Sequence, residues 1–141
     1  MGDAAPAVAL PGIGGTVGIT LEDLRGKVVY VDFWASWCGP CRVSFPQLEA
    51  IRRELAPQGF EVLAINVDED ENDASEFLSE VPVTYPIVRD AEGDTPMVYG
   101  IKGMPTGYLI DRKGVVRDIH EGYKKSDGEK LRELIIKLLG E

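Results

Sequence analysis

The only two cysteines of this chain, Cys38 and Cys41, are separated by Gly39 and Pro40. Two cysteines at this spacing can close a small disulfide ring, and no other cysteine is available to pair with either one. A cysteine at the start of a helix is favoured as the thiolate, because it faces the positive end of the helix dipole and unpaired backbone N–H groups. We therefore predict a thiol–disulfide redox centre in which Cys38 is the nucleophile and Cys41 resolves the mixed disulfide.

Two structural roles for the cysteine pair remain as alternatives. A zinc site needs four ligands, and beyond the two cysteines the chain has a single histidine, His120, which is distant in sequence. A purely structural disulfide would close so short a loop that it removes little entropy from the unfolded chain. We predict no metal and no cofactor other than the redox-active Cys38–Cys41 disulfide, and we interpret His120 as structural.

The residues before the cysteines, Val28–Trp34, are β-branched and aromatic with almost no alternation. This composition predicts a central strand that is buried on both faces. Asp32 is the one charged residue in the run, and burial would raise its pKa toward the range that is useful for proton transfer. The alternative is an aspartate at the surface end of the strand with access to solvent.

The apolar spacing of Phe45, Leu48, Ile51 and Leu55 predicts a helix from Cys38 to Gln58, with a kink at Pro46. A second, parallel strand is predicted at residues 60–67, which completes a βαβ unit. Later patterns predict a helix after a capping box at 73–76, a strand at 85–88, a short helix at 95–99, an antiparallel hairpin of 106–110 and 115–119, and a helix after a capping box at 126–129.

The fold class that these elements predict is α/β, with a mixed central sheet in the order βαβ–α–ββα and helices on both faces. Residues 1–20 are expected to form a small hairpin or an extended lead-in, followed by a capped helical turn at Thr20–Asp23. The acidic residues Glu61 and Asp68–Glu71 are interpreted as a solvated edge. A chain of 141 residues with 44% hydrophobic content fits a single domain spanning 1–141.

The formal net charge of -9 repels nucleic acid phosphates and anionic lipid surfaces, so we predict neither as a partner. The simplest interpretation of the acidic excess is solubility. Residues 1–8 contain no basic region and no long apolar run, so no signal peptide or membrane anchor is visible. A start of this kind also remains when a leader or anchor is trimmed off, so it does not establish a cytoplasmic protein.

Three segments together resemble the thioredoxin superfamily, specifically its TlpA/ResA-like branch: Asp32–Arg42 (DFWASWCGPCR), Gly103–Thr106 (GMPT) and Asp111–Gly114 (DRKG). The resemblance extends from about Ala5 to the end of the chain. It implies a cis peptide bond before Pro105, in a loop that lies against the disulfide, and a Met104 backbone that pairs with bound substrate. It also implies that Trp37 shields the thiols and that Asp32 accepts the proton of Cys41.

The activity that this resemblance implies is thiol:disulfide exchange with protein substrates. Gly39 and Pro40 between the cysteines are similar to the reducing members of the superfamily, so an upstream thiol reductant would have to regenerate the dithiol. The branch implies a periplasmic or other extracytoplasmic location, a monomer, and clients such as those of cytochrome c maturation. The alternatives are a general cytoplasmic thioredoxin and a redox-inactive binding module of the same fold.

The chain departs from its resemblance at three positions. Ser44 stands where several ResA-like proteins carry an acidic residue, three positions after the second cysteine. Ala64 stands where thioredoxins often carry the lysine that accompanies the buried aspartate. Gly107 replaces the second threonine after the cis-proline, and we expect it to loosen or open the substrate groove.

Overall fold

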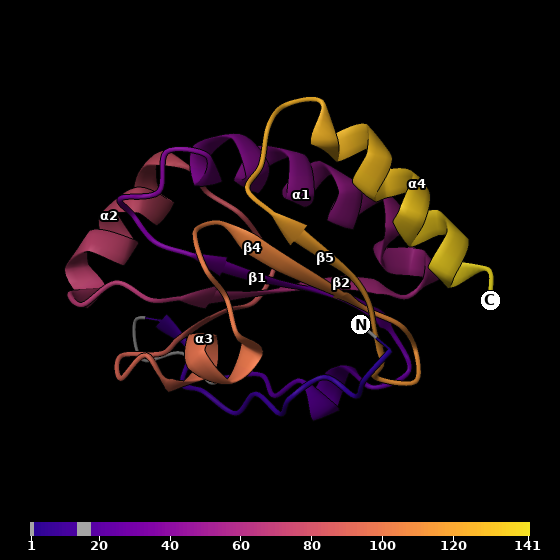
Figure 1. Ribbon diagram of the computed structural model, residues 1–141. Coiled ribbons are helices and arrows are strands. Elements are labelled where there is room, and N and C mark those ends of the chain that lie inside the picture. The colour runs from indigo at the N-terminus through magenta and orange to yellow at the C-terminus, as the bar shows by residue number, and fades with distance from the viewer. Residues whose placement is uncertain (1, 14–17) are drawn as a thin grey trace.

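A five-stranded mixed sheet forms the centre of the molecule in the computed structural model, which describes residues 2–13 and 18–141 (Figure 1). The strand order is β3-β2-β1-β4-β5. The parallel part comprises β1 (Val28–Trp34), β2 (Phe60–Asn66) and β3 (Ile87–Arg89). On the other side, β4 (Thr106–Ile110) is antiparallel to β1, and β5 (Val116–Glu121) is antiparallel to β4. The predicted βαβ unit and C-terminal hairpin are both confirmed.

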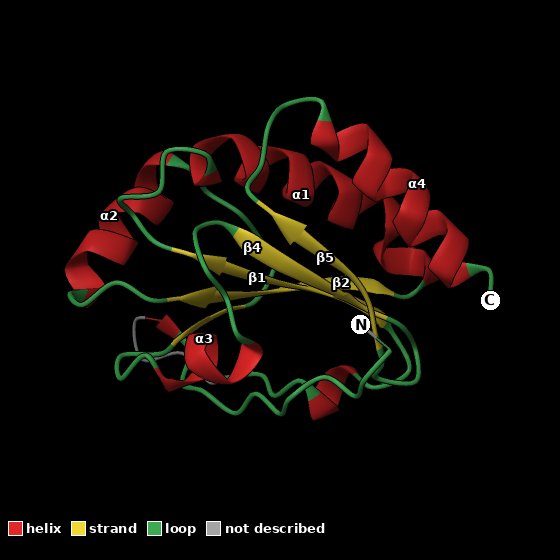
Figure 2. Cartoon of the chain, in the orientation of Figure 1, coloured by secondary structure: helices red, strands yellow, loops and turns green. Residues whose placement is uncertain are grey.

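Helices cover both faces of this sheet, as predicted (Figure 2). One face carries α1 (Cys41–Leu55), α2 (Glu71–Glu80) and α4 (Asp127–Leu139), and the other carries α3 (Asp94–Tyr99). Short 3-10 helices occupy Glu22–Leu24 (η2) and Ala56–Gln58 (η3). None of the helices in the described part of the chain is long and apolar enough to cross a membrane.

The strand β1 is buried along its whole length, and its alternate side chains enter two separate cores. Val29, Val31 and Phe33 face the side of the sheet that carries α3. Tyr30 and Trp34 face α1 and α4. The alternation places Asp32 in this second row, so a carboxyl group lies in the apolar layer beneath the cysteine helix.

The N-terminal segment is extended over its described residues. The backbone N–H of Val116 donates to Asp3 at 2.9 Å, and the N–H of Arg89 donates to Pro11 at 2.9 Å, so the segment passes from β5 to β3. The extended lead-in is therefore found over residues 2–13, whereas the alternative of a small hairpin within residues 1–20 depends in part on residues 14–17, which lie outside the described residues. Thr20 and Asp23 cap each other's backbone N–H groups at 3.0 and 3.1 Å, which confirms the predicted turn.

The start of α2 differs from its prediction. The helix begins at Glu71, because the carboxylate of Asp70 accepts a hydrogen bond from the backbone N–H of Asn72 at 2.9 Å. An N-cap at Asp70 satisfies a donor of the first turn before Asp73 is reached. The capping box predicted at 73–76 is therefore wrong by one turn.

The last helix and the edge strand also depart from their predictions. Ser126 makes no side-chain cap, because the carboxylate of Asp127 instead accepts the backbone N–H of Lys124 at 2.9 Å. The predicted capping box at 126–129 is thus wrong, although the helix itself is present. The edge strand β3 covers Ile87–Arg89 rather than residues 85–88, because its register follows the pairing of Ala64 with Ile87.

Candidate active site

The two cysteines form a disulfide just beyond the C-terminal end of β1, with their Cα atoms 5.4 Å apart. Cys41 is fully buried, and Cys38 is 3% exposed. Trp37, Gly39 and Pro40, which surround Cys38 in the sequence, are all exposed. Cys38 therefore lies nearer the molecular surface, and Cys41 lies behind it in the core.

The helix α1 begins at Cys41, so the prediction of a helix from Cys38 is wrong. The backbone N–H groups of Cys41 and Arg42 donate to the carbonyls of Cys38 and Gly39 at 3.2 and 3.0 Å. These bonds form a tight turn and pair backbone donors that a helix starting at Cys38 would have left free. The helix α1 can then stabilise a Cys38 thiolate only through its dipole, because it starts three residues after Cys38.

Asp32 is 1% exposed, and its backbone lies between Ala64 of β2 and Gly107 of β4. Burial raises the pKa of its carboxyl group to about 8, because the charged form loses its hydration. Its Oδ2 atom has no hydrogen-bond partner among the described residues. The alternative of an aspartate with access to solvent is wrong, because the side chain is buried in the core.

The peptide bond between Met104 and Pro105 is cis, as the resemblance implied. Thr106, at the start of β4, pairs with Phe33 near the end of β1. The loop that enters β4 and the loop that leaves β1 therefore lie at the same edge of the sheet. Met104 packs against both core clusters, and one of these contains the two cysteines.

Two groups at this edge are available to a partner molecule. The side chain of Trp37 is 68% exposed, so it covers little of the protein itself. In the described part of the chain, the backbone N–H and C=O of Met104 make no hydrogen bond with another backbone group. An extended segment of a substrate could pair with that backbone as an added strand does.

The Redoxin family model matches residues 1–135. The chain belongs to the Redoxin family. It is 35% identical over 125 residues to the thiol-disulfide oxidoreductase ResA of Oceanobacillus iheyensis, in a match that covers 86% of this chain and 65% of that protein. It is also 37% identical over 123 residues to the thiol:disulfide interchange protein DsbE of Pseudomonas fluorescens, covering 86% and 67% of the two chains. The chain spans less than two thirds of the length of the first two ResA proteins that it matches. The matches cover 65% and 59% of those proteins.

Solved structures agree with this assignment. A crystal structure of a candidate thiol:disulfide interchange protein DsbE from Chlorobium tepidum is 47% identical and has a TM-score of 0.94, covering 99% of this chain and 97% of that one. The thioredoxin domain of a thiol-disulfide oxidoreductase from Bacteroides vulgatus is 26% identical, with a TM-score of 0.86 and coverage of 98% and 96%. This Redoxin-family chain is therefore a TlpA/ResA-like member of the thioredoxin superfamily, with the thioredoxin-like fold.

The structure shows what surrounds each of the three residues at which this Redoxin-family chain departs from the resemblance. Ser44 is buried in α1, and its hydroxyl donates to the carbonyl of Cys41 at 3.3 Å. Ala64 is fully buried and pairs with Asp32, so a methyl group stands at the position of the missing lysine. A Cβ atom at Gly107 would overlap the ring and hydroxyl of Tyr30. The prediction that Gly107 opens a groove is wrong, because Tyr30 fills the space.

Asp68 contacts the cysteine loop, although its acidic neighbours in the sequence predicted a solvated edge. Asp68 is 1% exposed, and its carboxylate accepts hydrogen bonds from Ser36 of the cysteine loop and from Asn66. Glu61 from the same predicted edge is also buried, in an ion pair with Arg52 at 3.0 Å. Asp68 follows a strand parallel to β1, and the ends of parallel strands meet at one sheet edge. This topology was the signal that could have identified it.

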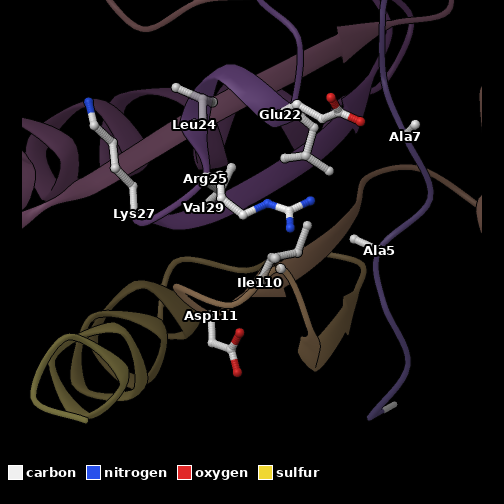
Figure 3. A pocket seen from close by; sticks show the side chains of 11 residues that line it. Ala5, Ala7, Glu22, Leu24, Arg25, Lys27, Val29, Ile110 and Asp111 are labelled. Atoms are coloured by element: carbon white, nitrogen blue, oxygen red, sulfur yellow. The ribbon is translucent and has the colours of Figure 1, made fainter.

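A small cavity of about 60 Å³ lies at the other end of β1, between the N-terminal segment and the residues before that strand (Figure 3). Its lining includes Ala5, Arg25, Lys27 and Ile110. Because β1 runs from Val28, next to this cavity, toward the disulfide, the cavity is separate from the cysteine site. Among residues 2–13 and 18–141, no group of three or more His, Cys, Asp or Glu side chains could hold a metal ion.

Proposed function

We propose that this protein is a thiol:disulfide oxidoreductase that reduces disulfides in protein substrates. The observation that carries the proposal is the Cys38–Cys41 disulfide, which lies at the sheet edge that also carries the cis-Pro105 loop, with Cys38 between exposed residues and Cys41 fully buried. The printed names of the relatives, ResA and DsbE, support the same chemistry.

The reaction begins with the reduced dithiol. The Cys38 thiolate attacks one sulfur of the substrate disulfide, a mixed disulfide forms, and the other substrate sulfur leaves as a thiolate. Cys41 then attacks the sulfur of Cys38, which expels the second substrate thiolate and closes the Cys38–Cys41 disulfide. Two electrons pass to the substrate, and an upstream thiol reductant restores the dithiol. The Cys38–Cys41 disulfide form is the product of this cycle.

Three further groups have roles in this mechanism. Asp32 accepts the proton of the Cys41 thiol, which makes Cys41 nucleophilic in the second step. The Met104 backbone and the cis-Pro105 loop bind an extended segment of the substrate. Trp37, Gly39 and Pro40 form the exposed surface around Cys38 that contacts the substrate.

We also propose an extracytoplasmic location, a monomeric state and clients such as those of cytochrome c maturation. These follow from the TlpA/ResA-like branch rather than from a feature of this chain. A general cytoplasmic thioredoxin would use the same cysteine chemistry with a reductase as its electron donor, so the two differ in donor and client. A redox-inactive binding module would not need the cysteines at all.

The experiment that tests this function follows the reduction of a model protein disulfide, such as that of insulin, by the reduced protein. With a thiol reductant present to restore the dithiol, we expect turnover by the wild type and none by the matched variant Cys38→Ser. Without that reductant, we expect a trapped mixed disulfide on Cys38 in Cys41→Ser and no adduct in Cys38→Ser. Peptide mapping of the adduct shows which cysteine carries the substrate. Absence of both turnover and adduct would exclude the oxidoreductase function and favour the binding module.

A further inference from the structure

The loop between β5 and α4, residues 122–126, contacts the cis-proline loop. The backbone N–H of Gly122 donates to the carbonyl of Pro105 at 2.8 Å. The φ angle of Gly122 is +74°, in the left-handed region that favours glycine, so the chain can turn there directly after β5. The position of the cis-proline loop is therefore tied to the position of the β5–α4 loop.

The same loop is also hydrogen-bonded to the cysteine helix, beside which it rises from the end of β5 (Figure 1). The hydroxyl of Tyr123 donates to Oε1 of Gln47 in α1 at 2.6 Å, and Nε2 of Gln47 donates to the carbonyl of Lys125 at 3.1 Å. Gln47 lies less than two turns after Cys41, at which α1 begins. One side chain of α1 thus holds the β5–α4 loop at two points.

The packing around the Gln47–Tyr123 hydrogen bond is tight. Tyr123 is buried, and it belongs to the core cluster that contains both cysteines. A Cβ atom at Gly128 of α4 would overlap Oε1 of Gln47 and would lie 3.2 Å from the Tyr123 hydroxyl. The absence of a side chain at Gly128 therefore leaves the space that this hydrogen bond occupies.

These contacts join the two parts of the site that a protein substrate must meet together. The cysteine pair lies at the start of α1, whereas the cis-Pro105 loop leads into β4, and the β5–α4 loop is hydrogen-bonded to both parts. In the proposed mechanism, the substrate pairs with the backbone of Met104 while one of its sulfurs reaches Cys38. Both contacts form at once only when the spacing between the cis-proline loop and α1 fits the substrate.

We propose that Tyr123 and Gln47 are positioning residues that hold the cis-Pro105 loop at the spacing from α1 that an extended protein substrate requires. Neither residue exchanges electrons or protons with the substrate, and both act through the β5–α4 loop. The inference rests on the proposed oxidoreductase function and assigns to this pair the adaptation of that chemistry to protein substrates. A small disulfide that reaches only the cysteines does not need the cis-proline loop, so its reduction should not depend on the pair.

Tyr123→Phe tests the proposal, because it removes the hydroxyl and keeps the ring in the core. With insulin as the substrate, we expect KM to rise about three- to tenfold, the range that the loss of one hydrogen bond gives, because binding must then also order the loop. We expect kcat to change by less than about twofold, since the cysteines are unaltered. The rate at which Ellman's reagent, a small aromatic disulfide, oxidises the reduced protein should stay at its wild-type value.

Two variants of Gln47 separate the hydrogen bond from packing. Gln47→Glu keeps an oxygen that accepts from the Tyr123 hydroxyl, and its KM for insulin should stay near the wild-type value. The bond to Lys125 that this variant loses is exposed, so water can replace it. Gln47→Leu has no acceptor and should raise KM as Tyr123→Phe does.

Two further variants test whether the effect belongs to this one hydrogen bond. If Gln47 and Tyr123 act through it, the double variant Gln47→Leu/Tyr123→Phe should have the same KM for insulin as either single variant. Tyr99→Phe is the matched control, because it removes a tyrosine hydroxyl that donates to the carbonyl of Pro6 at 2.7 Å in the core on the other face of the sheet. We expect its KM to be unchanged.

The outcomes separate this positioning role from the function on which it rests. A wild type that does not reduce insulin would overturn the proposed function itself. A wild type that reduces insulin, together with a Tyr123→Phe variant of unchanged KM, would overturn only the positioning role. Equal slowing with insulin and Ellman's reagent in Tyr123→Phe would also contradict it, because the hydroxyl would then act on the cysteines. If Tyr123→Phe does not fold, Gln47→Glu and Gln47→Leu decide alone, and equal KM values for the two contradict the proposal.

Discussion

The carboxylate of Asp68 accepts hydrogen bonds from both the backbone N–H and the hydroxyl of Ser36, at 2.9 and 2.7 Å, although 32 residues separate the two. Ser36 belongs to the loop between β1 and Cys38, and Asp68 follows β2. The backbone N–H of Val67 also donates to the carbonyl of Trp34 at 3.0 Å. The end of β2 therefore fixes the loop that presents the cysteines.

Replacing Asp68 with alanine should loosen this loop and destabilise the protein. The change leaves the donors of Ser36 and Asn66 without their common acceptor, and a buried group that loses its partner costs about 1–3 kcal/mol. Urea unfolding of the oxidised protein measures the change. Glu69→Ala is the matched control, because Glu69 is the exposed acidic neighbour. Equal stability of the two variants would show that the carboxylate does not hold the loop.

Replacing Asp32 with asparagine should stabilise the protein increasingly as the pH rises. The folded-state pKa of about 8 lies above the ordinary value of 3.8, so between these values the folded protein keeps a proton that the unfolded chain releases. Wild-type stability therefore falls with pH across this window, by up to about 1.4 kcal/mol per pH unit, and asparagine does not titrate.

The measurement for Asp32→Asn is the difference in unfolding free energy between variant and wild type, from pH 4 to pH 8. The other ionisable groups are common to both proteins, so the difference isolates the Asp32 carboxyl group. We expect it to grow with pH and to reach about 4 kcal/mol at neutral pH. If the difference in unfolding free energy stays constant over this pH range, Asp32 is ionised in the folded protein.

The sequence predicted the strands and the redox pair because their signals are local. A continuous β-branched run at Val28–Trp34 and a glycine turn between two short strands require no knowledge of distant residues. Helix starts were less accurate, since several acidic side chains compete to cap the same turn. Asp70 rather than Asp73 begins α2 because it reaches the backbone N–H groups of the first turn.

The parts of the site that the sequence did not predict depend on contacts between strands. Asp68 has the composition of a surface residue, and only the parallel pairing of β1 and β2 brings it to Ser36. The setting of Gly107 is likewise invisible in its own neighbourhood, because Tyr30 fills the missing side-chain position from another strand.

The two tryptophans of the chain should respond differently to truncation. Trp34 is fully buried against Phe45 and Phe77, whereas Trp37 is 68% exposed. Trp34→Ala should therefore lower the free energy of unfolding by about 3–5 kcal/mol, and Trp37→Ala by less than about 0.5 kcal/mol.

In rate measurements, Trp37→Ala should slow the reduction of insulin severalfold but leave the reaction with Ellman's reagent unchanged. A uniform loss with both substrates would place Trp37 in the cysteine chemistry instead of substrate contact.

Adding one methyl group at Gly107 should destabilise the protein by displacing Tyr30. A Cβ atom there overlaps the tyrosine ring, and overpacking of a core typically costs about 1–3 kcal/mol. Gly103→Ala is the matched control, because a Cβ atom at Gly103 meets no atom within 4 Å.

If the overlap with Tyr30 is the cause, Gly107→Ala should cost less in a Tyr30→Val background, where the space is vacant. Urea unfolding of the two single variants and the double variant gives the coupling energy, and simple additivity would show that Tyr30 and Gly107 do not share this space.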